Sequence, residues 1–236
     1  AGDYIITVGE EDVKAPAKTT LHYFGDLTSL LSEINDISKS KNDTLMKEKL
    51  LANLDCLFGA DSDIKKKLAD TAADYTSVYK KLADGTVYGG IEDIKSKIQK
   101  LLVLHDIYSA KDINTLMNIL EKEKKLLLID ADTAYETLSD SNMLESNTKN
   151  EICTGILGRD YKDISEFKTY FDDRVLTIAA KRANGWGDIK AVIEKNAVLI
   201  GVDTSKVKNE KSVYSYILTC RINSKDDIKK AFNSAL

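Results

Sequence analysis

Two histidines, His22 and His105, are the only imidazoles that this sequence offers for acid–base or nucleophilic chemistry. A Ser-His-Asp or Cys-His site needs one of them. His22 lies in a segment rich in β-branched residues, and His105 follows the apolar run Leu101–Leu104, which is typical of a helix face. No H-E-x-x-H motif is present, so a zinc site lacks its usual ligands. The sequence predicts no catalytic residue, no metal site and no cofactor.

The three cysteines, Cys56, Cys153 and Cys220, lie far apart in apolar stretches of helical character. Without a C-x-x-C pair they form neither a zinc knuckle nor a thioredoxin-like motif. Cysteine packs as a small hydrophobic side chain, so we expect three free, buried thiols and no disulfide framework.

Carboxylates are the next candidates for chemistry. D-x-D pairs begin at Asp61 and Asp130, but neither is followed by the glycine and glutamate that an EF-hand loop needs. Asp172 and Asp173 are adjacent acids that could serve glycoside hydrolysis. With 38 acidic residues in the chain, such pairs arise by chance and mark solvated faces. The glycine-rich segment 85–90 has no lysine in the phosphate-cradling position and predicts a turn.

Aromatic residues in turns are the remaining candidates for a binding site. Trp186 lies between glycines in the segment Asn184–Gly187, and Tyr88 precedes Gly89. An exposed indole or phenol ring in such a turn could stack on a sugar ring or on a partner protein. The alternative is that Trp186 folds back as a plug over a helix junction. Trp186 and Tyr88 are therefore the candidate binding residues.

Composition narrows the fold and the partners. The chain has 236 residues, 43% hydrophobic and 31% charged, with a net charge of −4. An acidic chain gains no electrostatic attraction to nucleic acid, and no apolar run reaches the length of a membrane span. A single proline, Pro16, occurs where average usage of about 5% predicts roughly twelve. Because proline breaks helices, this scarcity predicts a mainly α fold.

Three patterns recur along the chain and predict three consecutive units of three helices each. The first is an apolar helix end followed by Asp; the second is a helix start with two bulky apolar residues four positions apart; the third is a polar break with an N-cap residue. Such units would stack as a short solenoid or elongated bundle. We expect a small β element at 1–25 and helical units at 26–90, 91–163 and 164–236, the last ending in a further helix.

The polar breaks predict how helices begin and end. Asp43, Asp112 and Asp188 would each accept a hydrogen bond from an unpaired N–H of the following helix. Gly59 and Gly201 suit the left-handed conformation that ends many helices. Leu128 replaces this glycine in the middle unit, so we expect that helix end to close differently.

Two parts of the chain resemble known modules. The segment Gly2–Gly9, followed by Val13–Pro16 and Phe24, is similar to the end of an immunoglobulin- or fibronectin-like module. The segments Ile193–Asp203 and Ile228–Phe232 resemble helical repeats found between such modules and S-layer homology domains in secreted surface proteins of Gram-positive bacteria. The resemblance implies an extracellular or cell-wall location and carries over no catalytic residue.

Together, these features predict a non-enzymatic spacer, adhesion or interaction module of a secreted, cell-surface bacterial protein. Its partners would be cell-wall or extracellular proteins or polysaccharides, with no nucleic acid and no membrane span. Two alternatives remain open: a carbohydrate-binding module that uses Trp186 and exposed tyrosines, and an accessory domain of an extracellular polysaccharide-degrading enzyme. An intracellular helical scaffold is a further alternative.

Overall fold

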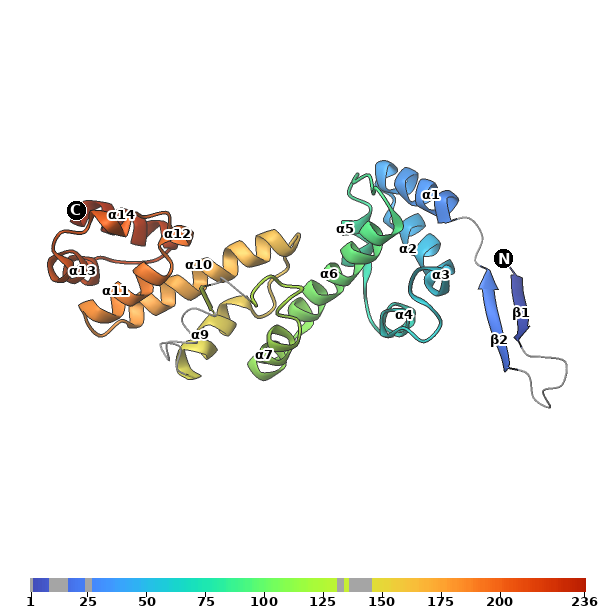
Figure 1. Cartoon of the computed structure of the whole chain (residues 1–236), viewed down its shortest axis with the longest axis horizontal. Coiled ribbons are helices and arrows are strands. Elements are labelled where there is room, and N and C mark those ends of the chain that lie inside the picture. Colours follow the sequence, from blue (N-terminus) through green and yellow to red (C-terminus); the bar gives the residue numbers. More distant parts are fainter. Residues whose placement is uncertain (1, 9–16, 24–26, 131–133, 136–145) are drawn as a thin grey trace. The chain divides into compact units, whose positions relative to one another are not determined.

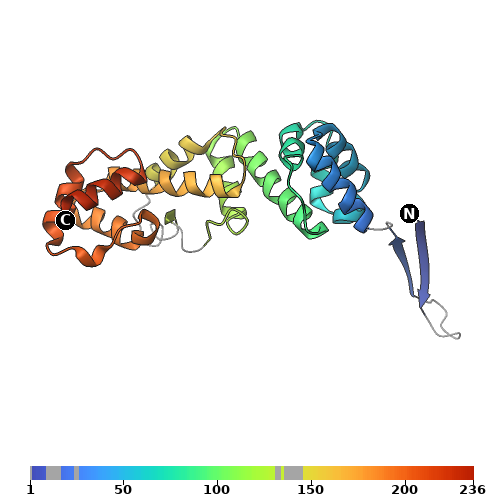
Figure 2. The same cartoon turned by 90° about the horizontal axis from the view of Figure 1, so that it is seen from above.

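The computed structural model describes residues 2–8, 17–23, 27–130, 134–135 and 146–236, and it is mainly helical (Figures 1 and 2). The helical class predicted from the scarcity of proline is therefore confirmed. The chain divides into two compact units, residues 1–99 and 100–236, and the boundary falls inside helix α6 (Ile91–Ser109).

The first unit begins with a two-stranded antiparallel sheet in which Gly2 pairs with Tyr23 and Val8 with Ala17. Helix α2 packs against both α1 and α5, and α3 packs against α4. Val13–Pro16 and Phe24, which were included in the resemblance to an immunoglobulin-like module, lie outside the described residues. The elements are β1 (Gly2–Val8), β2 (Ala17–Tyr23), α1 (Leu27–Ser40), α2 (Asp43–Ala52), α3 (Leu54–Phe58), α4 (Asp63–Ala69), α5 (Thr76–Leu82) and the start of α6.

The second unit is organised around the long helix α10. This helix packs against α9, α11 and α14, while α13 packs against α11 and α14 (Figure 1). Its buried side chains extend from Ile164 to Ala180, so α10 is covered along almost its whole length. The elements after α6 are α7 (Ile113–Lys122), α9 (Ser146–Ile156), α10 (Ile164–Arg182), α11 (Trp186–Lys195), α12 (Ala197–Ile200), the short 3-10 helix η1 (Thr204–Lys206), α13 (Glu210–Thr219) and α14 (Lys225–Ala235).

Helices α6, α10 and α14 begin with the apolar pair that recurs in the sequence. Both members of each pair are at most 1% exposed, so the pattern marks core-facing positions. Residues four positions apart lie on one face of a helix, which explains the spacing. Helix α1 carries a similar pair that was not predicted from the sequence, although its Leu30 is 8% exposed. The pairs are Leu30 and Ile34, Ile94 and Ile98, Phe167 and Phe171, and Ile228 and Phe232.

The same three helices share a second local feature, which α11 has as well through Asp188 and the Asn184 N–H. The acidic residue at the third helical position accepts a hydrogen bond from the N–H of the residue just before the N-cap. This bond measures 2.7 to 3.0 Å and satisfies a backbone donor that the helix cannot pair internally. The pairs are Asp93 with Gly89 in α6, Glu166 with Lys162 in α10, and Asp227 with Asn223 in α14.

The predicted N-caps are correct at one of three positions. Asp112 caps α7, accepting hydrogen bonds from the backbone N–H and the hydroxyl of Thr115. At α2 the cap is Asn42 rather than Asp43: the Asn42 side chain accepts a hydrogen bond from the Leu45 N–H, and Asp43 is already the first residue of the helix. Asp188 lies inside α11 and accepts its hydrogen bond from Asn184, before the helix.

The helix end at Leu128 contradicts the expectation that it closes differently from the glycine ends. Leu128 has φ 58°, in the left-handed region, close to φ 76° at Gly201. Both residues occupy the same two-bond closing motif. At Leu128 the N–H groups of residues 128 and 129 donate to Lys125 and Lys124; at Gly201 the corresponding donors bind Val198 and Ala197. The closing motif therefore holds Leu128, which is 52% exposed, in a backbone conformation that Leu itself disfavours.

Exchanging residue types at these two helix ends should change stability in opposite directions. Leu128→Gly should raise the free energy of unfolding by about 0.5–1 kcal/mol, since the left-handed penalty of about 1–2 kcal/mol exceeds the entropic cost of glycine. Gly201→Ala should lower it by about 1 kcal/mol, because alanine must adopt φ 76° and its Cβ would press on the Lys229 side chain. Urea denaturation followed by circular dichroism measures both. A loss of stability in Leu128→Gly would show that the leucine side chain outweighs backbone strain.

Candidate functional site

Tyr88, one of the two predicted binding residues, belongs to the core. Its side chain is 4% exposed and its hydroxyl donates to the Leu82 carbonyl at 2.8 Å. The Asn35 side chain accepts from the Tyr88 N–H at 2.7 Å and donates to the Tyr88 carbonyl at 3.1 Å. Burial raises the pKa of the phenol well above its ordinary value. The ring therefore has no free face for a ligand.

Trp186 retains an accessible surface. It is the first residue of α11, follows the N-cap Gly185, and is 38% exposed. Trp186 is therefore neither buried in a helix junction nor fully exposed to solvent. Trp186 lies in the second compact unit and Tyr88 in the first, so the structure does not join the two predicted residues in one described site.

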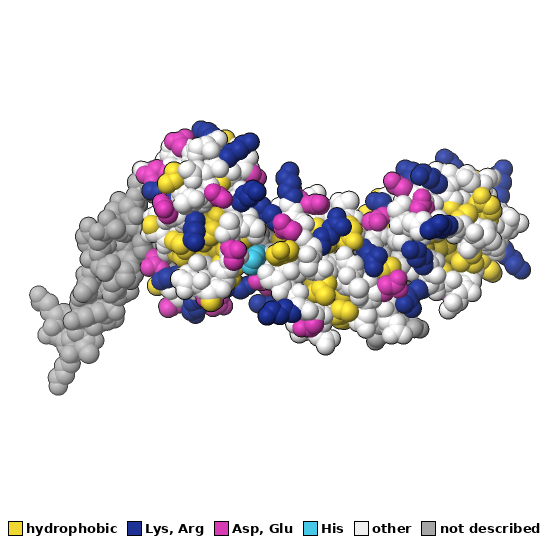
Figure 3. Space-filling model, turned by 180° about the vertical axis from the view of Figure 1, so that it is seen from behind, with side chains coloured by type: hydrophobic (Ala, Val, Ile, Leu, Met, Phe, Trp, Pro, Cys, Tyr) yellow, Lys and Arg dark blue, Asp and Glu magenta, His cyan; other side chains and the backbone are white. Residues whose placement is uncertain are grey.

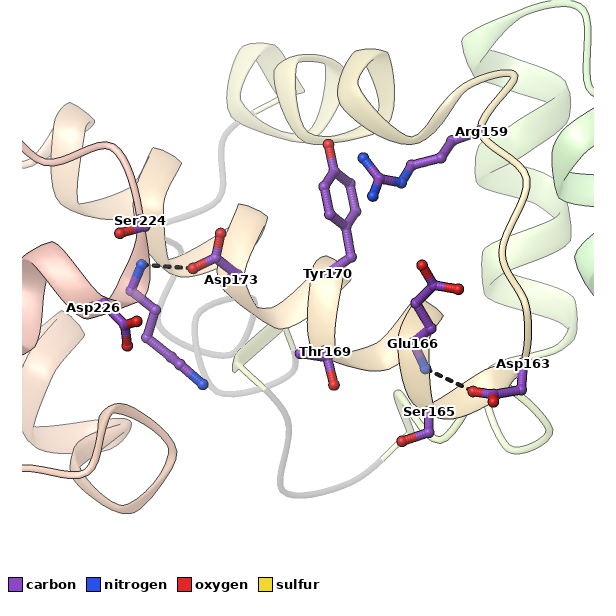
Figure 4. A pocket seen from close by; sticks show the side chains of 10 residues that line it. Arg159, Asp163, Ser165, Glu166, Thr169, Tyr170, Asp173, Ser224 and Asp226 are labelled. Atoms are coloured by element: carbon purple, nitrogen blue, oxygen red, sulfur yellow. Dashed lines mark hydrogen bonds between the residues drawn. The ribbon is translucent and has the colours of Figure 1, made fainter.

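One concave surface of the second unit is a groove between the N-terminal parts of α10 and α14, which we call the α10–α14 groove (Figure 4). It encloses about 650 Å³. Asp173 joins its two sides, because the Asp173 carboxylate accepts a hydrogen bond from the Lys225 N–H at 2.6 Å. The lining residues are Arg159, Asp163, Ser165, Glu166, Thr169, Tyr170, Asp173, Ser224, Lys225 and Asp226.

Arg159 occupies one end of the groove and is held there by aromatic rings. Its guanidinium carbon lies 3.8 Å from the centre of the Tyr170 ring (Figure 4). The same carbon lies 5.5 Å from the centre of the Tyr161 ring. The Tyr170 hydroxyl donates to the Gly155 carbonyl of α9 at 3.1 Å, which fixes the ring. Gly158, with φ 71°, ends α9 and turns the chain so that Arg159 follows directly.

Two of the groove's acids serve the local structure. Asp163 is the N-cap of α10 and accepts from the Glu166 N–H at 2.9 Å, and Glu166 in turn accepts from the Lys162 N–H. These bonds position the first turn of α10 along the groove wall. Asp226, in the first turn of α14, makes no side-chain hydrogen bond or ion pair with any described residue.

The adjacent acids Asp172 and Asp173 have separate structural roles, so they do not form the glycosidase pair considered from the sequence. Asp172 is 2% exposed and pairs with Lys168 at 2.5 Å, within α10. Asp173 binds the N-terminus of α14. Among the described residues, no group of three or more His, Cys, Asp or Glu side chains is arranged to hold a metal ion.

The Arg159–Tyr170 pair is not among the residues predicted from the sequence. Eleven positions separate the two residues, and they meet only because the Gly158 turn folds the loop back over α10. The sequence contains part of the signal. Arg159 directly follows a glycine at a helix end, and two tyrosines lie within eleven positions of it, so cationic and aromatic side chains are concentrated there. The partner of Arg159 could not be chosen among those tyrosines without the fold.

The charged surface and the absence of an apolar span in the described residues agree with the sequence analysis, whereas the burial of the cysteines agrees only in part. Basic and acidic side chains are interspersed over the face that Figure 3 presents. No helix in the described part of the chain has the length and apolar character needed to cross a membrane. The three cysteines are free, but only Cys153 is buried; Cys56 and Cys220 are half-buried.

Burial should make Cys153 the least reactive of the three thiols. Desolvation raises its pKa from 9.0 to about 11, so at pH 8 the folded protein holds about a hundredfold less Cys153 thiolate than the unfolded chain. Timed alkylation with iodoacetamide at pH 8, read by peptide mass spectrometry, should label Cys153 at least that much faster in urea than in buffer. Equal rates in both conditions would mean that α9 opens freely.

The single tryptophan gives a direct test of its predicted exposure. Because Trp186 is 38% exposed, acrylamide should quench its fluorescence in the folded protein, though less than in urea. Trp186→Phe should abolish the signal and leave the helical circular dichroism unchanged. Emission that resists quenching until the protein unfolds would place the indole in the core.

Comparisons with protein-family models, with curated proteins and with solved structures give no match to this chain.

Proposed function

We propose that this chain is a non-enzymatic spacer and interaction module of a secreted, cell-surface-associated protein. Three consecutive three-helix units, at 26–90, 91–163 and 164–236, would stack as a short solenoid or elongated bundle behind an N-terminal β element at 1–25. The observation that carries the proposal is the recurrence of one helix start: a buried apolar pair together with an acid that reaches back to the residue before the N-cap.

The recurring start falls on α6, α10 and α14, which would join one unit to the next, and also on α11, where Asp188 accepts from the Asn184 N–H and Ile189 and Ile193 are buried. Helix α10 packs against α9 of the preceding predicted unit and against α11 and α14 of its own. In a repeat array, such shared contacts make each unit depend on its neighbours and resist bending. A chain built in this way can hold flanking domains apart while presenting its surface to partners.

The proposed location rests on resemblance in the sequence. Residues Ile193–Asp203, which include the end of α11, α12 and Gly201, supply the closest likeness to repeats in surface proteins of Gram-positive bacteria. The helix-ending motif at Gly201 supports the alignment, because it recurs at Leu128 in the preceding unit. A cell-wall or extracellular protein or polysaccharide remains the proposed partner.

A second candidate function, carbohydrate binding, is favoured by the exposed part of Trp186. Indole rings at helix starts can stack on sugar rings while their edges remain packed on the protein. A spacer and a sugar-binding surface are compatible within one module, since the first depends on the buried faces and the second on exposed side chains.

The spacer proposal is tested by the distribution of a distance within the chain. Spin labels would be attached at the exposed positions Lys47→Cys and Lys195→Cys, in a variant whose native cysteines are replaced by serine or alanine. A stacked, semi-rigid array should give one narrow distance distribution by pulsed electron paramagnetic resonance. Two labels within the third predicted unit, at the exposed positions Lys181→Cys and Lys195→Cys, provide the matched control for label flexibility.

A distribution between Lys47 and Lys195 that is much broader than the control would contradict the spacer proposal. It would mean that the predicted units move independently, as flexibly linked domains do.

A further inference from the structure

The Arg159 guanidinium is fixed in place without the use of its hydrogen-bond donors. Tyr170 and Tyr161 hold it through its π face, at 3.8 and 5.5 Å. Within the described part of the chain, its side chain makes no hydrogen bond or ion pair. A guanidinium carries five N–H donors in a planar fork that fits a carboxylate with two parallel hydrogen bonds.

Groups suited to sugar hydroxyls line the rest of the α10–α14 groove. Ser165 and Thr169 contribute hydroxyl groups from α10, and Asp226 contributes a carboxylate from α14 (Figure 4). Their side chains form no hydrogen bond with any residue that the structure describes. Hydroxyls both donate and accept, and a carboxylate accepts from hydroxyl donors, so the three can serve the mixed pattern of a sugar ring.

The charges in the groove argue against a densely anionic ligand. Two cations, Arg159 and Lys225, face four carboxylates, those of Asp163, Glu166, Asp173 and Asp226. Phosphate or sulfate clusters would be repelled by this excess of negative charge. A ligand with one isolated carboxylate among neutral polar groups satisfies Arg159 without meeting that repulsion.

The groove also lacks the features by which proteins hold peptides. Its lining consists of one aromatic and nine polar or charged residues, with no aliphatic side chain. Amphipathic helices require an apolar groove, extended peptides an open sheet edge, and proline-rich segments an aromatic-lined surface. Polar, hydroxyl-rich lining favours a carbohydrate.

We propose that the α10–α14 groove binds an oligosaccharide in which a uronic acid is present, with Arg159 binding the uronate carboxylate and Ser165, Thr169 and Asp226 binding ring hydroxyls. A volume of about 650 Å³ lies within the usual range for small-ligand sites. This inference goes beyond the spacer function. The two proposals can fail separately, because ligand titration tests an exposed surface whereas the distance measurement tests the buried contacts between units.

The experiment is an NMR titration of the whole ¹⁵N-labelled chain, with the Arg159 side-chain Nε–H signal as the local probe. The first ligand is glucuronosyl xylotriose, a tetrasaccharide with one uronate among neutral sugars, and the matched ligand is its methyl ester, which keeps the ring hydroxyls but removes the charge. Glucuronosyl xylotriose should shift the signals of Arg159 and of the first turns of α10 and α14 saturably. Esterification should weaken binding at least about tenfold, since charge-assisted hydrogen bonds are lost.

Four variants separate this site from structural effects. Arg159→Lys keeps the charge but loses the planar fork, so it should bind at least about tenfold more weakly with an unchanged melting temperature. Tyr170→Leu removes the stacking surface and should weaken binding as well, whereas Tyr170→Phe keeps the ring and should retain the affinity. Arg221→Lys, at an exposed arginine outside this groove, is the control and should bind like the parent chain.

Four results would overturn the proposal. Equal binding of the acid and its ester would show that Arg159 does not read a carboxylate. Binding of tetraglutamate with the same dependence on Arg159, and no binding of glucuronosyl xylotriose, would assign the groove to an acidic peptide. Absence of saturable shifts with any of these ligands, or shifts that Trp186→Phe abolishes and Arg159→Lys does not, would remove the groove as the site.

Discussion

The burial of α10 on several faces is the constraint on which the second unit depends. A helix covered from Ile164 to Ala180 needs neighbours that approach closely, and α9 does so at Gly155. The Arg174 side chain lies over the Gly155 Cα, where any larger residue would displace it, and donates to the Glu151 carbonyl at 2.9 Å. The one carboxylate buried on α10, that of Asp172, is paired with Lys168, as a buried charge requires.

Polar contacts then fix where the neighbouring helices lie. Helix α13 is tied to α11 by Lys190, which contacts Glu210 at 2.7 Å, and by the Tyr214 hydroxyl, which donates to Glu194 at 3.1 Å. Exposed ion pairs of this kind contribute about 1 kcal/mol or less, so the apolar contacts supply most of the stability. The pairs mainly select one register among the several that apolar faces alone would allow.

Helix starts were predictable from the sequence because their information is local. The spacing of Phe167 and Phe171 places both on one face, and an acid one position before the first of them completes the start. The N-caps were harder, because Asn42 and Asp43 are adjacent residues that can both cap, and backbone geometry chose the first.

The candidate site was not predictable, for a related reason. Tyr88 and Trp186 both follow or precede glycines in turns, yet the Asn35 side chain, 53 positions away, holds one turn against the core. Arg159 likewise acquires its role from Tyr170 through the fold of a loop. Local sequence specifies which residues begin a helix, whereas exposure and pairing depend on contacts between distant segments.

The helix-ending residues set the direction in which the chain continues. At two helix ends the residue with positive φ lies five positions after the C-cap of the preceding helix: Leu128 after Glu123, and Gly201 after Asn196. At the third end, Gly59 lies six positions after the C-cap Asn53. One added residue rotates the exit of a helix by about 100°. Gly59 also has ψ 159° where Gly201 has ψ 44°, so the chain leaves α3 on a different heading. After this change of direction the chain forms α4, the additional helix of the first unit.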